Sequence, residues 1–297
     1  MSERSISFHE LRNAAKFPLP TAHFLVAADG TCLAYRSYLT HEPRAVLLFY
    51  HGGGAHSAAG YQFLGKGLQA NYDTVVITPD IRGHGASGGT RGDSPTPTHV
   101  WEDISSFIRQ IRQQYPGIPL FLGGHSSGAG LVLNYAVRQG REKVEGYVFL
   151  SPQLGARANT DRPSIAVPFA RVNESAFAAY AASGGTAHAH DHAVQFNYPG
   201  EILASDPGLV SSITVSMSAA LIPSAPSNQF ASLDAPFGLW IGTEDELFLP
   251  ERVLQFGSIA LNPLSKSRVA VIPGEKHLSV LVRADATIGP WIVDVLR

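Results

Sequence analysis

A serine between two glycines is the clearest candidate for covalent chemistry in this sequence. Residues Gly124–Gly128 read Gly-His-Ser-Ser-Gly and match the pattern G-x-S-x-G. They follow the apolar run Leu120–Gly123 and precede the helical pattern Leu131–Val137, which predicts a strand–turn–helix unit. Such a turn exposes the serine at the strand end, so we interpret Ser126 as a nucleophile. An ordinary helix N-cap is the alternative.

The same pattern occurs a second time, at Gly85–Gly89. This copy lies in a glycine-rich stretch after Asp80, and no apolar run stands directly before it. Because a nucleophile elbow needs a preceding strand, the sequence favours Ser126 over Ser87.

A serine hydroxyl is a poor nucleophile at neutral pH and needs a base, usually a histidine held by a carboxylate. When the serine occupies such an elbow, the chain order is serine, acid, histidine. The sequence has 12 histidines, and His277 follows all the others, including His188, His190 and His192. His277 also comes just after the last predicted strand, so we predict that it is the base.

The acid is expected near a strand end between the serine and the histidine. The segment Gly242–Glu246 follows the predicted strand Phe237–Ile241 and contains three acids. We predict that Asp245 orients the histidine, while Glu244 and Glu246 remain competing choices.

A tetrahedral oxyanion needs preorganised N–H donors. The backbone N–H of Ser127, directly after the nucleophile, is one candidate. The second is expected in the loop after the third strand, which reads His-Gly-Gly-Gly-Ala-His-Ser from residue 51. We choose the N–H of Gly53, with Gly52 and Gly54 shaping a loop that lets the backbone approach the substrate. A plain turn is the alternative.

These residues need an alternation of strands and helices to position them. Two apolar runs, Ala22–Ala28 and Leu33–Leu39, flank Asp29-Gly30 and predict an antiparallel hairpin. Further apolar runs predict buried strands at 45–50, 74–78, 120–123, 147–150, 237–241 and 269–272. Helical patterns occupy 61–70, 99–115, 128–138, 250–261 and 284–296. This order predicts an α/β fold with a mostly parallel sheet.

One long stretch, residues 155–232, interrupts the alternation. It is rich in alanine and serine, and an unstructured loop of this length is improbable inside a compact domain. We therefore expect a helical cap at 155–232, between core parts at 1–154 and 233–297; a decorated crossover without a binding role is the alternative. Further candidates for substrate binding are Gly52, Gly54, His125, Phe169, Phe177, Phe196 and Phe230. The phenylalanines could equally pack the cap onto the sheet.

Composition excludes several classes of protein. Lys plus Arg (22) nearly balances Asp plus Glu (24), giving a net charge of −2 and none of the basic excess of a nucleic-acid binder. The single cysteine, Cys32, excludes an intramolecular disulfide, and we expect it to be buried. No signal-peptide core or long apolar run is present, so we expect a cytoplasmic protein without integral membrane segments.

The chain resembles an α/β-hydrolase, and within that fold the monoacylglycerol lipase/lysophospholipase-like group, which includes serine aminopeptidase-type hydrolases. Besides the elbow and the Asp245/His277 pair, the shared motifs are His51-Gly52-x-Gly54-x-His56-Ser57 and Asp80-x-Arg82-Gly83-His84-Gly85-x-Ser87. The resemblance covers about residues 22–297 and implies a carboxylic ester hydrolase with an eight-stranded, mostly parallel sheet flanked by helices and a cap after strand six. The elbow departs from the group, since Ser127 stands where methionine is frequent.

The cluster His188-Ala189-His190-Asp191-His192 contains enough histidines to consider zinc. The flanking Gly184-Gly185 favours a solvated cap loop, so we predict no metal there.

We predict hydrolysis of a small ester with an apolar acyl or alcohol part, without metal or organic cofactor. Thioester, amide or carbon–carbon cleavage and perhydrolysis use the same triad and remain alternatives. A non-catalytic binding module is a further alternative, although such proteins often lack a triad member.

Overall fold

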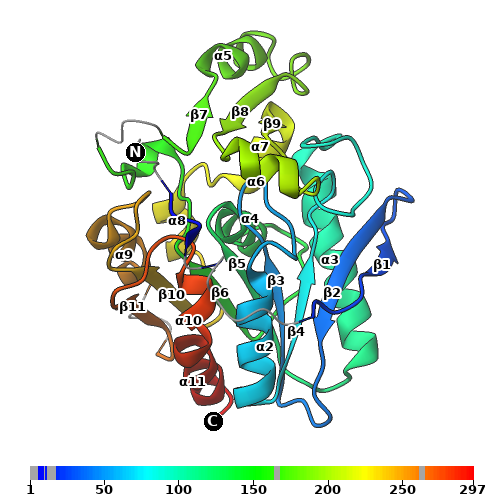
Figure 1. The fold of residues 1–297 in the computed structure, drawn as a ribbon, viewed down its shortest axis with the longest axis vertical. Helices are drawn as coiled ribbons and strands as arrows, with labels where there is room; N and C mark the ends of the chain where they lie inside the picture. The colour runs from blue at the N-terminus through cyan, green and yellow to red at the C-terminus, as the bar shows by residue number, and fades with distance from the viewer. Residues whose placement is uncertain (1–5, 10, 12–17, 164–167, 261–264) are drawn as a thin grey trace.

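An eight-stranded sheet forms the centre of the protein, with the strand order β1-β2-β4-β3-β5-β6-β10-β11 (Figure 1). The computed structural model describes residues 6–9, 11, 18–163, 168–260 and 265–297. The strands of this sheet are β1 (His23–Val26), β2 (Cys32–Tyr38), β3 (Ala45–Tyr50), β4 (Thr74–Pro79), β5 (Leu120–His125), β6 (Gly146–Leu150), β10 (Phe237–Gly242) and β11 (Arg268–Ile272).

The strands follow the apolar runs of the sequence closely. All six residues of β3 are buried, as are those of β4 and β5, because helices cover both faces of the sheet. β1 and β2 form the antiparallel hairpin predicted at Asp29-Gly30, and the pairs from β4 to β11 are parallel. The predicted α/β fold is therefore confirmed.

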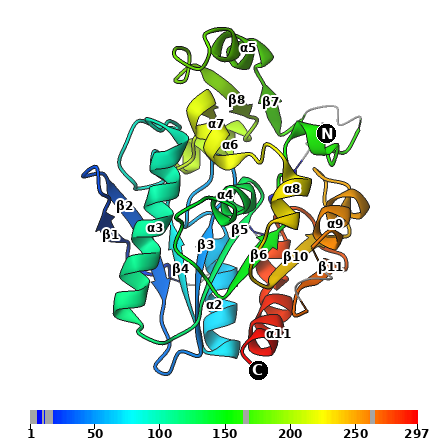
Figure 2. The ribbon, with the colours of Figure 1, turned by 180° about the vertical axis from the view of Figure 1, so that it is seen from behind.

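Two layers of helices enclose the sheet, as the opposite views of Figures 1 and 2 show. One face carries α2 (Tyr61–Tyr72), α10 (Val280–Arg283) and α11 (Asp285–Val295). The other face carries α3 (Pro97–Gln114), α4 (Ser127–Ala136) and α9 (Pro250–Ser258). Within the described residues, none of these helices is both long and apolar enough to cross a membrane.

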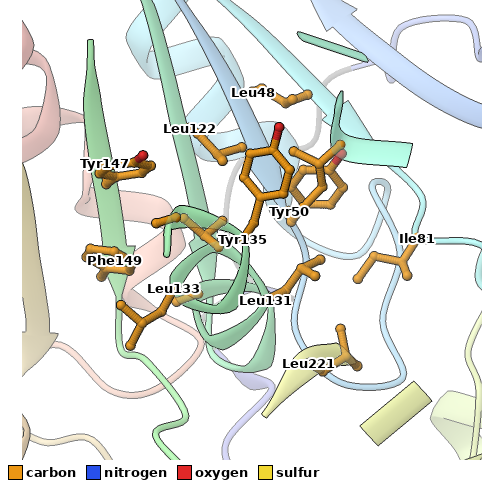
Figure 3. Close-up of a cluster of buried hydrophobic side chains, with 14 of the residues drawn as sticks. Leu48, Tyr50, Ile81, Leu122, Leu131, Leu133, Tyr135, Tyr147, Phe149 and Leu221 are labelled. Atoms are coloured by element: carbon orange, nitrogen blue, oxygen red, sulfur yellow. The ribbon is translucent and has the colours of Figure 1, made fainter. Parts of the chain in front are cut away.

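Helix α4 directly follows the proposed nucleophile, Ser126, and is packed tightly into the core. Its Leu131, Leu133 and Tyr135 are fully buried against side chains of β3, β5 and β6 (Figure 3). Burying one such side chain contributes roughly 1.5–3 kcal/mol. The hydroxyl of Tyr135 lies 2.9 Å from Ser105 Oγ, so this buried polar group is also satisfied. The residue that begins the helix is therefore held by a rigid core.

The segment between β6 and β10 forms a cap at one end of the sheet (Figure 1). It contains a short 3₁₀ helix (Ala156–Ala158), α5 (Glu174–Ala182), α6 (Gly200–Ser205), α7 (Val215–Leu221) and α8 (Pro226–Ala231). It also contains an antiparallel sheet of β7 (Ala170–Val172), β8 (His192–Phe196) and β9 (Ser212–Thr214).

The segment contains the expected helices, and the small sheet is an addition that the sequence did not indicate. Strands β7 and β9 have three residues each, which is too short for a period-two pattern to stand out in the sequence.

The expectation that Cys32 is buried is also wrong. Cys32 is exposed and lies opposite Val26, whose side chain is 66% exposed, in the pair β1–β2. This pair lies at the edge of the sheet, where apolar alternation does not guarantee burial.

Candidate active site

Ser126 occupies a sharp turn between β5 and α4. Its backbone has φ 55° and ψ −123°, a region that non-glycine residues rarely adopt. A Cβ atom at Gly124 would lie 2.3 Å from the backbone of Gly128, and one at Gly128 would lie 2.3 Å from the carbonyl oxygen of His51. Both glycines of the motif are therefore required for close packing, and the partly exposed Ser126 faces a pocket.

The second copy of the motif has a different environment. Ser87 is buried; its hydroxyl donates to the carbonyl of Asp80 (2.7 Å) and accepts from the N–H of Ala34 (2.8 Å). These bonds tie the loop after β4 to β2, which is a structural role.

Asp245 and His277 meet at the carboxyl ends of β10 and β11. The Nδ1 atom of His277 lies 2.8 Å from Oδ2 of Asp245, and both residues are almost completely buried. The other oxygen, Oδ1, accepts the N–H groups of Leu247 and Phe248, each at 2.9 Å. Burial alone would raise the pKa of Asp245, but the charge of His277 and these hydrogen bonds outweigh it and lower the pKa. The acid is thus ionised and accepts the Nδ1 proton of the imidazole, leaving Nε2 as the basic atom.

The two competing acids lie elsewhere. Glu244 is exposed, and Glu246 accepts the backbone N–H of His277 with Oε2 (2.8 Å) and that of Ser7 with Oε1 (3.0 Å). Glu246 therefore positions the backbone at His277 and leaves the imidazole to Asp245. The sequence did not indicate this role, because it depends on a residue far away in the chain.

The glycine loop after β3 lies directly over the nucleophile. A Cβ at Gly52 would lie 3.1 Å from Cβ of Ser126, and one at Gly53 would lie 2.7 Å from the ring of Phe196. The N–H of Gly52 donates to the hydroxyl of Tyr61 (2.6 Å) and is therefore occupied. Within the described residues, the N–H groups of Gly53 and Ser127 donate to no other protein group. These two donors are free to bind an oxyanion.

A buried tyrosine connects this loop to His277 through hydrogen bonds. Besides accepting from Gly52, the Tyr61 hydroxyl lies 3.1 Å from Nδ1 of His125, and Nε2 of His125 lies 2.9 Å from the carbonyl oxygen of His277. A carbonyl can only accept, so His125 carries its proton on Nε2 and accepts from Tyr61 at Nδ1. Burial, and then the nearby His277, lower the pKa of His125 to about 3, so it is neutral at pH 7. The sequence predicts His125 as a substrate contact, and it contains no local signal for the role of Tyr61, which lies 64 residues away in the chain.

The cap is fastened to the glycine loop by two backbone positions. The hydroxyl of Tyr198 donates to the carbonyl of Gly53 (2.8 Å), and the N–H of Val210 donates to the carbonyl of Gly54 (2.8 Å). Gly54 has φ +70°, and a Cβ there would lie 2.3 Å from the carbonyl oxygen of Val210. The loop and the cap therefore form one wall of the site.

A side-chain pair adds a third fastening. Nε2 of His56 lies 2.8 Å from Oδ2 of Asp206, and Oδ1 of Asp206 accepts the N–H of Gly208 (3.0 Å). The hydrogen bond to His56 is the main cause that lowers the pKa of Asp206, against the opposing effect of burial.

The loop after β4, which begins with the motif at Asp80, forms hydrogen bonds to both ends of the glycine loop. Asp80 accepts the N–H of Ser57 (2.6 Å) and that of Ala86 (2.8 Å), and the N–H of Ile81 donates to Nε2 of His51 (3.0 Å). The motif thus holds the loop in place and does not face the pocket.

A pocket of about 450 Å³ contains both Ser126 and His277 in its lining. Its wall is mainly apolar and includes Ala55, Phe63, Phe169, Tyr198, Ile202, Leu209 and Leu278, together with Ile6, Phe8 and Leu11 near the N-terminus. An apolar group beside a nucleophile and a base fits this arrangement.

The four phenylalanines proposed for the pocket have different positions. Phe169 lines it, and Phe196 stacks on Phe169 with ring centroids 5.7 Å apart. Phe177 packs on a small cluster within the cap, and Phe230 is fully buried against Phe149 and Phe237. Of these four side chains, Phe169 alone is among the described residues that line the pocket, and Phe196 lies behind it.

The three cap histidines point to separate partners. His188 lies 2.8 Å from Asp191, His190 lies 2.9 Å from Asp93, and His192 lies 2.9 Å from Ser212 Oγ. They do not converge, and the described part of the chain contains no group of three or more potential metal ligands.

Comparison with known proteins places the site in a family context. A family model described as serine aminopeptidase, S33, matches residues 41–279, a span that includes the glycine loop, Ser126, Asp245 and His277. Human monoglyceride lipase is 35% identical over 144 residues, which cover 48% of this chain and 46% of the relative. Monoacylglycerol lipase from Mycolicibacterium smegmatis is 29% identical over 146 residues, with 49% and 51% covered. The chain thus matches about half the length of these relatives.

Solved structures resemble the chain over nearly its whole length. A soluble variant of monoglyceride lipase from Saccharomyces cerevisiae, in complex with a substrate analog, gives a TM-score of 0.72 at 19% identity, covering 94% of this chain and 97% of that one. A thermostable carboxyl esterase from Bacillus coagulans gives 0.70 at 16% identity, with 95% and 100% covered. At such identities the likeness shows a shared fold.

Proposed function

This chain belongs to the serine aminopeptidase S33 family of α/β-hydrolases, and on that basis we propose that it hydrolyses carboxylic esters with an apolar acyl or alcohol part. The observation that carries the proposal is that His277, paired with the buried Asp245 at 2.8 Å, lines the same pocket as Ser126, whose backbone has a positive φ. Relatives named monoglyceride lipase and a structural neighbour named carboxyl esterase support the ester class.

The reaction follows from the roles of these groups. Oγ of Ser126 attacks the ester carbonyl carbon while Nε2 of His277 takes the hydroxyl proton. The N–H groups of Gly53 and Ser127 donate to the oxyanion of the tetrahedral intermediate. The carbon–oxygen bond to the alcohol then breaks as His277 returns the proton to the leaving oxygen. Water, deprotonated by His277, then attacks the acyl carbon. The bond from this carbon to Oγ of Ser126 breaks as His277 returns the proton to Oγ, and the acid is released, so the scheme uses no metal or organic cofactor.

The apolar wall favours an acyl or alcohol chain over a charged amine. An aminopeptidase would need a carboxylate to receive the substrate amine. Asp206 is the one acid among the described residues that line the pocket, and it is already paired with His56. Thioesters share the same acyl chemistry and remain the second choice.

The two core parts of the chain and the cap have separate tasks in this proposal. Residues 1–154 and 233–297 supply the catalytic groups, and residues 155–232 supply the cap. We also propose a cytoplasmic location, which is consistent with a single cysteine that has no partner for an intramolecular disulfide.

A matched pair of serine variants tests the proposal. With p-nitrophenyl esters from acetate to palmitate, Ser126→Ala should lose turnover. The folded fraction of Ser87→Ala should retain the turnover of the wild type. A fluorophosphonate followed by peptide mapping should place its adduct on Ser126. Turnover by Ser126→Ala, or an adduct only at another serine, would contradict the assignment.

A further inference from the structure

We propose that the segment formed by Ile6–His9 and Leu11, here called the N-terminal arm, is a wall of the substrate pocket and limits the length of the apolar group that fits. This inference rests on the proposed ester hydrolysis and adds a determinant of its specificity. The arm lies outside the span matched by the family model, which begins at residue 41.

The first support is the position of the arm's apolar side chains. Ile6, Phe8 and Leu11 all line the pocket that contains Ser126 and His277. Ile6 is only 5% exposed, although it comes from a stretch of sequence with few apolar residues. His9 is exposed, so the arm has an apolar side toward the pocket and a polar side toward solvent.

The second support is that the arm is bound by the catalytic loop, which is the loop after β10 that contains Asp245 and Glu246. The N–H of Ser7 donates to Oε1 of Glu246 (3.0 Å), and Oε2 of the same carboxylate accepts the N–H of His277 (2.8 Å). A single side chain therefore fixes both the arm and the backbone of the proposed base. A segment that was merely loose at the surface would not share an anchor with the catalytic histidine.

The third support comes from two contacts on other sides of the pocket. The ring of Phe8 lies 6.0 Å, centroid to centroid, from the ring of Tyr198 in the cap. The methyl groups of Leu11 lie 3.0 Å from where a Cβ of Gly60 would be, just before α2. The arm therefore contacts the cap, the core and the catalytic loop, and closes the space between them.

This placement predicts an effect on chain-length selectivity. A methylene group that moves from water into an apolar site changes kcat/KM by about fourfold, provided that the contact is kept in the transition state. Shortening a side chain in the arm should make room for additional methylenes, and enlarging one should exclude them. A segment with only a structural role would change stability without changing the preferred chain length.

The test compares two opposite changes with a control. Leu11→Ala and Phe8→Ala should raise the ratio of kcat/KM for long over short p-nitrophenyl esters by at least about fourfold. Leu11→Trp should lower this ratio. The control is Phe24→Ala in β1, where the removed ring is 58% exposed and outside the pocket lining; its ratio should equal that of the wild type. Thermal unfolding of each variant identifies those that are folded.

The outcomes separate the two proposals. If the wild type hydrolyses the esters but folded Leu11→Ala, Phe8→Ala and Leu11→Trp all keep its chain-length profile, the arm is not a wall and the inference is overturned. If the wild type hydrolyses no ester, the proposed function fails instead. In that case, calorimetry tests whether the arm is a wall. It measures how tightly Ser126→Ala binds fatty acids of increasing length, from butyrate to palmitate. Leu11→Ala in that background should shift the tightest binding to longer chains, and an unchanged profile would overturn the inference.

Discussion

The phenolic oxygen of Tyr61 lies 3.1 Å from Nδ1 of His125 and 2.6 Å from the backbone nitrogen of Gly52. Since His125 in turn contacts the carbonyl of His277, one chain of hydrogen bonds connects the glycine loop to the base. The three hydrogen bonds all run in the same direction: the N–H of Gly52 donates to Tyr61, the hydroxyl of Tyr61 donates to His125, and Nε2–H of His125 donates to the carbonyl of His277. We therefore propose that Tyr61 and His125 position the glycine loop and His277.

Removing the Tyr61 hydroxyl should disturb both ends of that chain. In Tyr61→Phe we expect kcat to fall about tenfold to a hundredfold with little change in KM, because the base and the oxyanion loop lose their common support. The buried N–H of Gly52 loses its acceptor, which should cost about 1–3 kcal/mol of stability. Steady-state kinetics and thermal unfolding measure the two effects.

Tyr50→Phe is the matched control for that change. Tyr50 is also a buried tyrosine, but its hydroxyl has no hydrogen-bond partner among the described residues. This variant should keep its activity and be as stable as the wild type or more stable. Equal losses in both variants would assign the effect of Tyr61→Phe to general packing.

Neutralising Asp245 should abolish most of the rate without altering the fold. Asp245→Asn cannot accept the Nδ1 proton of His277 in the same way, so the imidazole adopts the wrong tautomer and kcat should fall on the order of 10⁴-fold. Glu244→Gln changes an exposed acid of the same loop and should retain near-normal kcat. A larger loss in Glu244→Gln than in Asp245→Asn would reverse the assignment of the acid.

The Asp206–His56 contact should give the cap a pH-dependent contribution to stability. The folded-state pKa of Asp206 is lowered below its ordinary value of 3.8, so its contribution to stability is complete above that value and is lost as the pH falls through the folded pKa. At neutral pH, Asp206→Asn should lose about 0.5–1 kcal/mol, the range for a partly exposed pair. Urea unfolding should show this difference shrinking at acid pH.

Asp191→Asn provides the comparison, because Asp191 also pairs with a histidine but both side chains are about half exposed. Its effect on stability should be close to zero at every pH. If Asp206→Asn also shows no difference at neutral pH, the contact does not stabilise the cap.

A methyl group at Gly53 should damage the proposed oxyanion site. The added Cβ would lie 2.7 Å from the ring of Phe196, so either the loop or the cap must move. We expect kcat to fall about a hundredfold to a thousandfold in Gly53→Ala, as when one oxyanion donor is lost. Gly200→Ala should be nearly neutral, because a Cβ there would meet no described atom within 4 Å. Normal kcat in Gly53→Ala would remove Gly53 from the site.

The sequence by itself determined the features that depend on local patterns. Apolar runs indicated the inner strands, because a strand covered on both faces must be apolar along its whole length. The edge hairpin β1–β2 was indicated by two apolar runs on either side of the Asp29-Gly30 turn. Position after a strand separated the elbow at Ser126 from the copy at Ser87, and chain order singled out His277 before any contact was known. The strands and the elbow needed only neighbours within a few residues, and the choice of His277 needed only order along the chain.

The tertiary structure alone decided which distant residues meet. In the fold, the imidazole of His277 contacts Asp245, and the backbone N–H of His277 donates to Glu246. Tyr61 contacts His125, and the N-terminal arm lies beside the pocket. The tertiary structure also sorted Phe169 into the pocket and Phe230 into the core. Side chains of one type look alike in a sequence, and their roles differ only through which faces of separate elements pack together, which no local period encodes.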